Sequence, residues 1–409
     1  MHKPTSRSRR RFLVAGAVAG TALYVNQRGL RYPRMGFEHR PPAKQLDSVS
    51  ALVTLEHAIF VEQKPDSQMK LRAIAPEPTI ELSAKLQGQL TIDLNNVAPS
   101  ALLQVSGDTA VSVHESIEGI NRQLEINLMP GQSINLSWKL AQQDGAKFAV
   151  IGDSGAGKEL EWILHRAENL GAQFLLHLGD FNYVEGEYDR AIELFNKAPF
   201  PCYVSIGNHD YNDSGLIYQQ FINEVGPMNH SFDIAGTRFA NIDTAADFFP
   251  ASSGQRGLLF DRLFEDKTQY TDQVFFTHRP FYDVREGEHH VIGGLGEIPW
   301  LKQQIKHSGC DNLLTGHVHH SAETNLDGLR QWTVGEGLGF EDILSQKQVA
   351  QLLLGTVERG RKVDYQWAAI EMPWIAHRSP THEIKLKRDH SPDKLEWYRA
   401  KLKQELESV

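Results

Sequence analysis

Apolar and polar residues alternate through much of the first third of the chain. The alternation is clearest at 89–94 (QLTIDL), 123–128 (QLEINL) and 133–138 (SINLSW). A period of two places successive side chains on opposite faces of a strand, so each run is typical of a β-strand with one buried face. We therefore predict a β-sandwich-like accessory domain over residues 48–145. Its sequence contains no cluster of titratable residues that would indicate a function.

The pattern changes at Lys147, where short apolar runs begin to alternate with amphipathic stretches. These segments are 148–151, 158–169, 174–178, 187–196 and 203–206. Strand–helix–strand connections of this length predict parallel βαβ units. Each apolar run ends in a glycine followed by a side chain that can bind a metal, namely Asp153, Asp180 and Asn208. Because ligands bind outside the carboxyl ends of strands in open α/β sheets, we expect these side chains to converge.

The second half of the chain repeats this arrangement. A strand predicted at 274–277 ends at His278, and one at 313–315 ends at Gly316-His317-Val318-His319-His320. Further elements are predicted as strands at 331–334, 351–357 and 363–370 and as a solvated helix at 394–406. We expect an α/β domain over residues 146–371 and a C-terminal extension with a helix over 372–409.

The N-terminus combines a basic segment with a short apolar run. Ser8-Arg9-Arg10-Arg11-Phe12-Leu13 leads into the apolar residues 14–25, which is the order of an export signal, and the paired arginines resemble the bacterial twin-arginine type. The run is short for a membrane span of ~20 residues. We predict a signal over 1–25 and a linker over 26–47. A retained membrane anchor stays open, since no clear cleavage site follows. The expected partner is the twin-arginine export machinery, and the expected location is periplasmic or extracytoplasmic.

Charge and composition narrow the function classes. The net charge of −9 argues against a general nucleic-acid or anionic-membrane surface, which requires clustered Lys and Arg. The two cysteines, Cys202 and Cys310, are too few for a disulfide framework or a Cys-rich metal site. Buried thiols are the favoured interpretation for both, and one disulfide stays open in an exported protein.

The predicted strand ends supply a large set of metal ligands. They offer two carboxylates, one amide oxygen, three imidazoles and a phenol, which belong to Asp153, Asp180, Asn208, His278, His317, His319 and Tyr183. Seven ligands are too many for one tetrahedral zinc, but they suit two ions that share a carboxylate. Imidazoles mixed with hard oxygens favour iron or first-row divalent metals over Mg²⁺ and Ca²⁺.

Taken together, five motifs resemble the calcineurin-like metallophosphoesterase superfamily. They are 152–155 (GDSG), 179–183 (GDFNY), 207–210 (GNHD), His278 and 316–319 (GHVH). The resemblance covers residues 147 to about 335 and implies an αββα sandwich of mixed sheets flanked by helices. Two details of these motifs are similar to those of the purple acid phosphatase branch of this superfamily. Gly155 replaces a ligand histidine of most members, and Tyr183 follows Asp180 by three residues, as does the tyrosine that binds ferric iron in that branch.

The resemblance implies a ligand set and a reaction. One ion, Fe(III), would be held by Asp153, Asp180, Tyr183 and His319. A second ion, divalent Zn, Fe or Mn, would be held by Asp180, Asn208, His278 and His317. His209 would face the phosphate and stabilise or protonate the leaving oxygen, with Asp210 orienting His209. A metal-bound hydroxide would then attack the phosphorus of a small phosphoester in line. His289 and His290 are interpreted as solvated loop residues, and His320 is as consistent with a structural as with a functional role.

Three other interpretations compete with this one. Residues 152–158 match the spacing of a phosphate-binding P-loop, but Glu159 replaces the Ser or Thr that holds Mg²⁺ there. A Mn- or Fe-dependent phosphodiesterase or nucleotidase of the same superfamily would leave Tyr183 unligated. A non-catalytic protein that binds an envelope partner would not be expected to retain the full ligand set.

Overall fold

The computed structural model describes ten segments of the chain. They are residues 44–48, 50–63, 68–141, 144–210, 217–245, 254–265, 269–285, 289–292, 297–339 and 350–372. The predicted signal, the linker up to residue 43 and the predicted helix at 394–406 lie outside these segments. Within the described residues, no helix is both long enough and apolar enough to cross a membrane.

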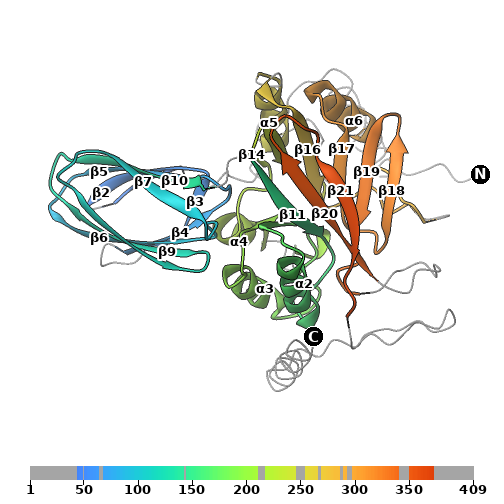
Figure 1. The fold of residues 1–409 in the computed structure, drawn as a ribbon, viewed down its shortest axis with the longest axis horizontal. Helices are drawn as coiled ribbons and strands as arrows, with labels where there is room; N and C mark the ends of the chain where they lie inside the picture. Colours follow the sequence, from blue (N-terminus) through green and yellow to red (C-terminus); the bar gives the residue numbers. More distant parts are fainter. Residues whose placement is uncertain are drawn as a thin grey trace, which may run out of the picture.

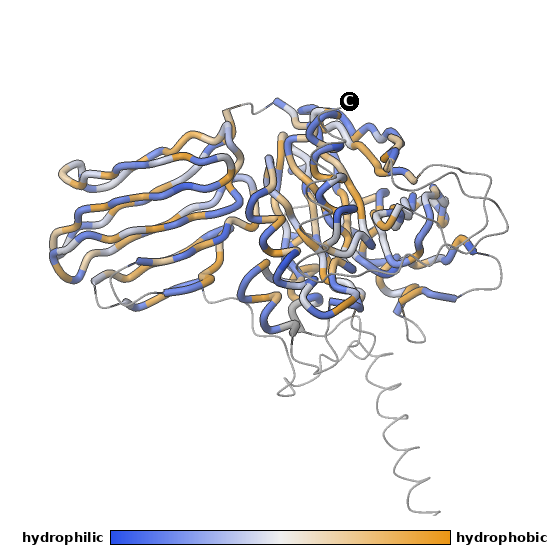
Figure 2. Tube along the Cα trace, turned by 90° about the horizontal axis from the view of Figure 1, so that it is seen from below, coloured by the Kyte–Doolittle hydropathy of each residue, from blue (hydrophilic) through white to orange (hydrophobic). Residues whose placement is uncertain are grey.

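The N-terminal part is a sandwich of two five-stranded sheets with strand orders β1-β2-β5-β10-β7 and β3-β4-β6-β9-β8 (Figure 1). The strands are β1 Gln45–Asp47, β2 Ala51–Glu56, β3 Ala58–Gln63, β4 Gln68–Ala73, β5 Thr79–Ala84, β6 Gly88–Asn95, β7 Ala101–Gly107, β8 Ser112–Glu118, β9 Asn121–Leu128 and β10 Ser133–Leu140. Every second residue of β9 is buried, and the hydropathy along these strands alternates accordingly (Figure 2). The predicted N-terminal β domain is confirmed, although its first strand precedes the expected start at residue 48.

The C-terminal part contains two mixed sheets, with orders β13-β12-β11-β20-β21 and β14-β15-β16-β17-β19-β18. Their strands are β11 Gly145–Ile151, β12 Phe174–His177, β13 Cys202–Val204, β14 His230–Ile234, β15 Thr237–Asn241, β16 Asp272–Thr277, β17 Asn312–Thr315, β18 Ser321–Leu326, β19 Leu329–Val334, β20 Gln351–Glu358 and β21 Asp364–Ala369. The helices are α2 Lys158–Asn169, α3 Glu187–Asn196, α4 Ile217–Glu224, α5 Gly254–Glu265 and α6 Glu297–Ser308. The short 3-10 helix η1 spans Asn208–Asp210.

The packing of single strands shows that this domain has four layers. In β16, Val274 and Phe276 belong to the core shared with the other sheet, whereas Phe275 packs in a second core with residues of α5 and α6. On the opposite side, α2 and α3 contribute to the first core and flank the β13-β12-β11 sheet (Figure 1). The predicted α/β fold with two sheets between helical layers is therefore confirmed.

A buried polar network joins the two domains. The side-chain amide of Asn96 donates to the Cys202 carbonyl at 3.1 Å and accepts the Cys202 N–H at 2.8 Å, so it pairs with the outer edge of β13 as a neighbouring strand would. Arg72 donates to Asn196 Oδ1 at 2.6 Å and to the same Cys202 carbonyl at 3.2 Å. Cys202 and Cys310 are both buried free thiols, as the sequence favours.

Candidate active site and metal centre

The carboxyl ends of strands from both sheets meet at one place. β11, β12 and β13 are parallel neighbours, and they are followed by Asp153, Asp180 and Asn208. β16 and β17 are parallel neighbours in the other sheet, and they are followed by His278 and by the 316–320 turn. Because these strand ends face each other across the two sheets, the structure brings all seven predicted ligand residues together in two adjoining groups.

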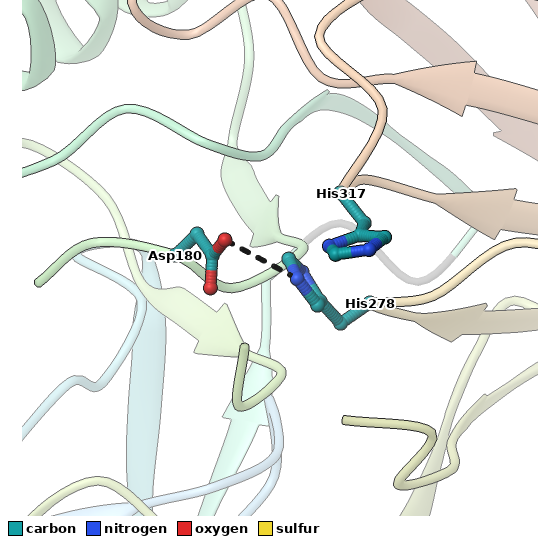
Figure 3. Close-up of side chains that lie close together, drawn as sticks. All are labelled: Asp180, His278 and His317. Carbon is teal, nitrogen blue, oxygen red and sulfur yellow. Dashed lines mark ion pairs between the residues drawn. The ribbon is translucent and has the colours of Figure 1, made fainter. Parts of the chain in front are cut away.

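The first group consists of Asp180, His278, His317 and Asn208. One ligand atom from each of Asp180, His278 and His317 lies within 4.8 Å of the others (Figure 3). His278 Nε2 is 3.4 Å from Asp180 Oδ2 and 2.9 Å from Asn208 Oδ1. Its Nδ1 is 2.7 Å from the Leu178 carbonyl, so Nδ1 carries a proton and donates it. A neutral His278 therefore directs its Nε2 lone pair at two oxygen acceptors, an arrangement that a cation stabilises.

The second group consists of Asp153, Tyr183 and His319. The phenol oxygen of Tyr183 lies 3.2 Å from His319 Nε2 and 3.5 Å from Asp153 Oδ1. His319 Nε2 is 3.6 Å from the same Asp153 oxygen. The other oxygen, Oδ2, accepts the N–H of His317 at 2.8 Å, and this bond ties the second group to the loop of the first. A carboxylate, a phenol and an imidazole, three possible metal ligands of different types, thus face one point.

The two histidines of the 316–319 motif serve different groups. Strand-like geometry predicts that both side chains point the same way, but His317 has a φ of 67°, in the left-handed region. This turn of the backbone directs His317 toward His278, with ring centroids 4.9 Å apart, and His319 toward Tyr183. The motif therefore contributes one imidazole to each group.

Three of the predicted ligand residues have a strained backbone, His317 and the two aspartates Asp153 and Asp180. Asp153 and Asp180 have φ values of 60° and 58°, a conformation that L residues seldom adopt and that stores strain at functional sites. The turns also need glycine because of close approach. A Cβ on Gly207 would overlap the Asp180 carboxylate, so only glycine lets the loop after β13 pass this close.

The electrostatics of the site favour positive charge. Burial raises the pKa of Asp153. Burial also opposes the ionisation of Asp180, but His278 nevertheless holds the pKa of Asp180 below its usual range. The same pairing raises the pKa of His278 to about 9, although burial alone would lower it. The pair of Asp180 and His278 therefore binds a proton readily at Nε2 of His278. A set of carboxylates, imidazoles, an amide and a phenol that attracts positive charge in this way fits divalent or trivalent transition metals.

The two predicted catalytic residues differ in exposure, since His209 is exposed and Asp210 is buried. His209 is exposed, its ring lies 4.6 Å from the Tyr183 ring, and its N–H donates to Asp180 Oδ1 at 2.9 Å. The Asp210 carboxylate is fully buried and accepts three main-chain N–H groups, from Gly207 at 2.7 Å, Asp180 at 2.9 Å and Phe181 at 3.0 Å. Asp210 thus holds the loops after β12 and β13 together. Its predicted contact with the His209 ring stays a prediction.

The structure adds His177, which the sequence analysis did not single out. This fully buried residue accepts the Gly179 N–H through Nδ1 at 3.2 Å, and its Nε2 lies 2.8 Å from Ser154 Oγ. Burial lowers the pKa of His177 to about 3, so it is neutral at ordinary pH. It links the loop of Asp153 to that of Asp180. In the sequence, His177 is one residue of an apolar strand, and nothing besides its residue type marks it as part of the site.

Three further histidines named in the sequence analysis are His290, His289 and His320. His290 is exposed, and its ring is 5.9 Å from that of His317. Asp283 accepts the His290 N–H at 2.9 Å and also binds Arg285, so the loop is anchored near the site. His289 is exposed, in agreement with its interpretation as a solvated residue. The N–H of His320 donates to the Val318 carbonyl at 2.7 Å within the turn.

Comparison with known proteins agrees with this geometry. Residues 146–321 match the sequence model of the calcineurin-like phosphoesterase family. This segment contains all seven ligand residues and both predicted catalytic residues. Residues 146–321 therefore resemble a calcineurin-like phosphoesterase domain, and the protein is a hydrolase. The match to this family implies a dinuclear metal centre, for which Asp180, His278 and His317 form a candidate ligand cluster.

Solved structures resemble the protein only distantly. A purple acid phosphatase from yellow lupin (Lupinus luteus) seeds is 13% identical, with 79% of this chain and 73% of that chain covered and a TM-score of 0.46. A dimetal phosphatase from Danio rerio is 10% identical, with 54% and 98% covered and a TM-score of 0.40. Likenesses at this level say nothing about substrate or metal. No curated protein matches the sequence.

The contacts of Asp210 lead to a prediction about stability. Asparagine has one acceptor oxygen where aspartate has two, so Asp210→Asn leaves a main-chain N–H facing an NH₂ group. We expect the free energy of unfolding of the metal-free protein to fall by about 1–3 kcal/mol, measured by denaturant unfolding. The exposed Asp364→Asn serves as control and should leave it unchanged. If Asp210→Asn hydrolysed phosphoesters more slowly but kept the stability of the wild type, the role of Asp210 in binding main-chain N–H groups would be contradicted.

Proposed function

We propose that the protein is an exported phosphomonoesterase of the purple acid phosphatase type, with an Fe(III) ion beside a divalent Zn, Fe or Mn ion. The observation that carries this proposal is the position of Tyr183. Its phenol oxygen lies within 3.5 Å of both Asp153 and His319, in the part of the site where Gly155 removes a ligand expected in most relatives. A phenol is a hard oxygen ligand, and it suits a trivalent ion better than imidazole does.

The residues divide between the two ions as their positions suggest. In this proposal one ion is held by Asp153, Asp180, Tyr183 and His319, and the other by Asp180, Asn208, His278 and His317. Asp180 would be shared because its carboxylate contacts His278 of the first group and also interacts electrostatically with the Asp153 carboxylate of the second. When bound, such a pair of cations supplies Lewis-acid chemistry that activates water and neutralises phosphoryl charge.

The surrounding residues orient the substrate and move the proton. His209 is exposed and its ring packs on that of Tyr183, which supports a role in facing an incoming phosphate ester. We assign His209 the task of protonating the leaving oxygen. The main-chain bonds of Asp210 hold the His209 turn against Asp180 while the proton moves.

The proposal predicts a colour that depends on Tyr183. A ferric phenolate absorbs visible light, so the metal-replete protein should be pink to violet. Tyr183→Phe should bleach it, whereas the distant Tyr270→Phe should not. The measurements are iron content, the visible spectrum and hydrolysis of phosphomonoesters and diesters across pH. A colourless, iron-free and fully active wild-type enzyme would contradict the iron assignment and favour the Mn-dependent diesterase or nucleotidase.

Export is proposed from the sequence of residues 8–13 alone. If the twin-arginine machinery recognises this segment, an Arg9→Lys, Arg10→Lys double variant should remain in the bacterial cytoplasm while the wild type reaches the periplasm. Fractionation followed by immunoblotting measures this. If both proteins reached the periplasm in equal amounts, the assignment of a twin-arginine signal would be wrong. Wild-type protein in the membrane fraction would indicate a retained anchor.

A further inference from the structure

Glu187, the first residue of α3, has a buried carboxylate that is 1% exposed. Its Oε2 accepts the N–H of Tyr183 at 2.6 Å and that of Val184 at 3.1 Å. Its Oε1 accepts the N–H of Ala156 at 3.2 Å. The two oxygens of one side chain therefore bind two different loops, those that follow β12 and β11.

These two loops carry Asp153 and Tyr183, two of the three residues of the second group. Ala156 follows Asp153 by three residues, and Tyr183 places its phenol near Asp153 and His319. Between Tyr183 and α3 the segment 184–186 is exposed, so packing contributes little to its position. The bonds to Glu187 are thus main restraints on the distance between the phenol and the Asp153 carboxylate.

We propose that Glu187 is a positioning residue for the metal centre. It fixes the loop of Tyr183 against the loop of Asp153 and so sets the geometry of the phenol ligand. This inference rests on the proposed role of Tyr183 as a ligand. Residues that orient metal ligands in this way commonly change metal affinity or activity by about 10–100-fold when replaced.

The simpler explanation is that Glu187 only stabilises α3. An acidic residue in the first turn interacts favourably with the helix dipole. Asp189 lies in the same first turn but is exposed, so it has the dipole interaction without the contacts to the two loops. Asp189→Asn is therefore a matched control that separates stabilisation of the helix from positioning of the ligand.

The test compares Glu187→Gln with Asp189→Asn in the full-length, metal-loaded protein. Glutamine keeps the size of the side chain, but its NH₂ group faces a donor on one of the two loops. We expect Glu187→Gln to shift or weaken the visible band, to lose iron to a chelator about 10-fold faster and to lower kcat at least 10-fold. KM should change much less, and Asp189→Asn should match the wild type in all three readouts.

A second variant keeps the test decisive if Glu187→Gln folds poorly. Glu187→Asp retains the charge at the start of α3 but is one methylene shorter, so it reaches both loops less well. We expect an intermediate loss of band intensity and iron retention. The positioning role would be overturned if the wild type is coloured and a folded Glu187 variant keeps the same visible band, iron retention and kcat. A wild type without iron or colour would instead overturn the proposed function.

Discussion

Three carboxylates, those of Asp153, Asp180 and Asp210, are buried together at the ends of three adjacent parallel strands. Like charges removed from water are costly unless hydrogen bonds or opposite charges compensate them. Main-chain N–H groups satisfy Asp210, but they bind Asp153 and Asp180 only in part. The remaining oxygens face imidazoles and a phenol, and this environment explains why the proton affinity of His278 is raised. The site is therefore built for added positive charge, which two metal ions would supply.

Buried side chains bind the loops that hold these groups and so restrain their positions. Asp210 connects the loops after β12 and β13, while His177 and Glu187 connect the loops after β11 and β12. Each compensates main-chain N–H groups that turns leave without a partner in a sheet or helix. Such support explains how Asp153, Asp180 and His317 can keep their left-handed backbone conformations. Ligand geometry thus depends on residues that do not bind metal themselves.

Most of the fold could be predicted because the hydrophobic period changes sharply at Lys147. Helices α2 and α3 begin and end at the predicted residues, and the strand ends with glycine identified the ligand positions. The supporting residues could not be predicted in this way. Glu187 looks like an ordinary acidic residue at a helix start, and its partners are backbone atoms that carry no sequence signal. The contact of Asn96 with Cys202 likewise depends on how two domains pack, which periodicity within one strand does not encode.

The proposed function requires Asp180 to lie between two metal ions. A crystal structure of the metal-replete protein, with anomalous diffraction recorded at the iron, zinc and manganese edges, measures this directly. We expect two peaks about 3.5–4 Å apart, with Asp180 bound to both and the Tyr183 oxygen bound to the iron. A single peak, or a pair of peaks with Asp180 bound to neither, would contradict a dinuclear centre that shares Asp180.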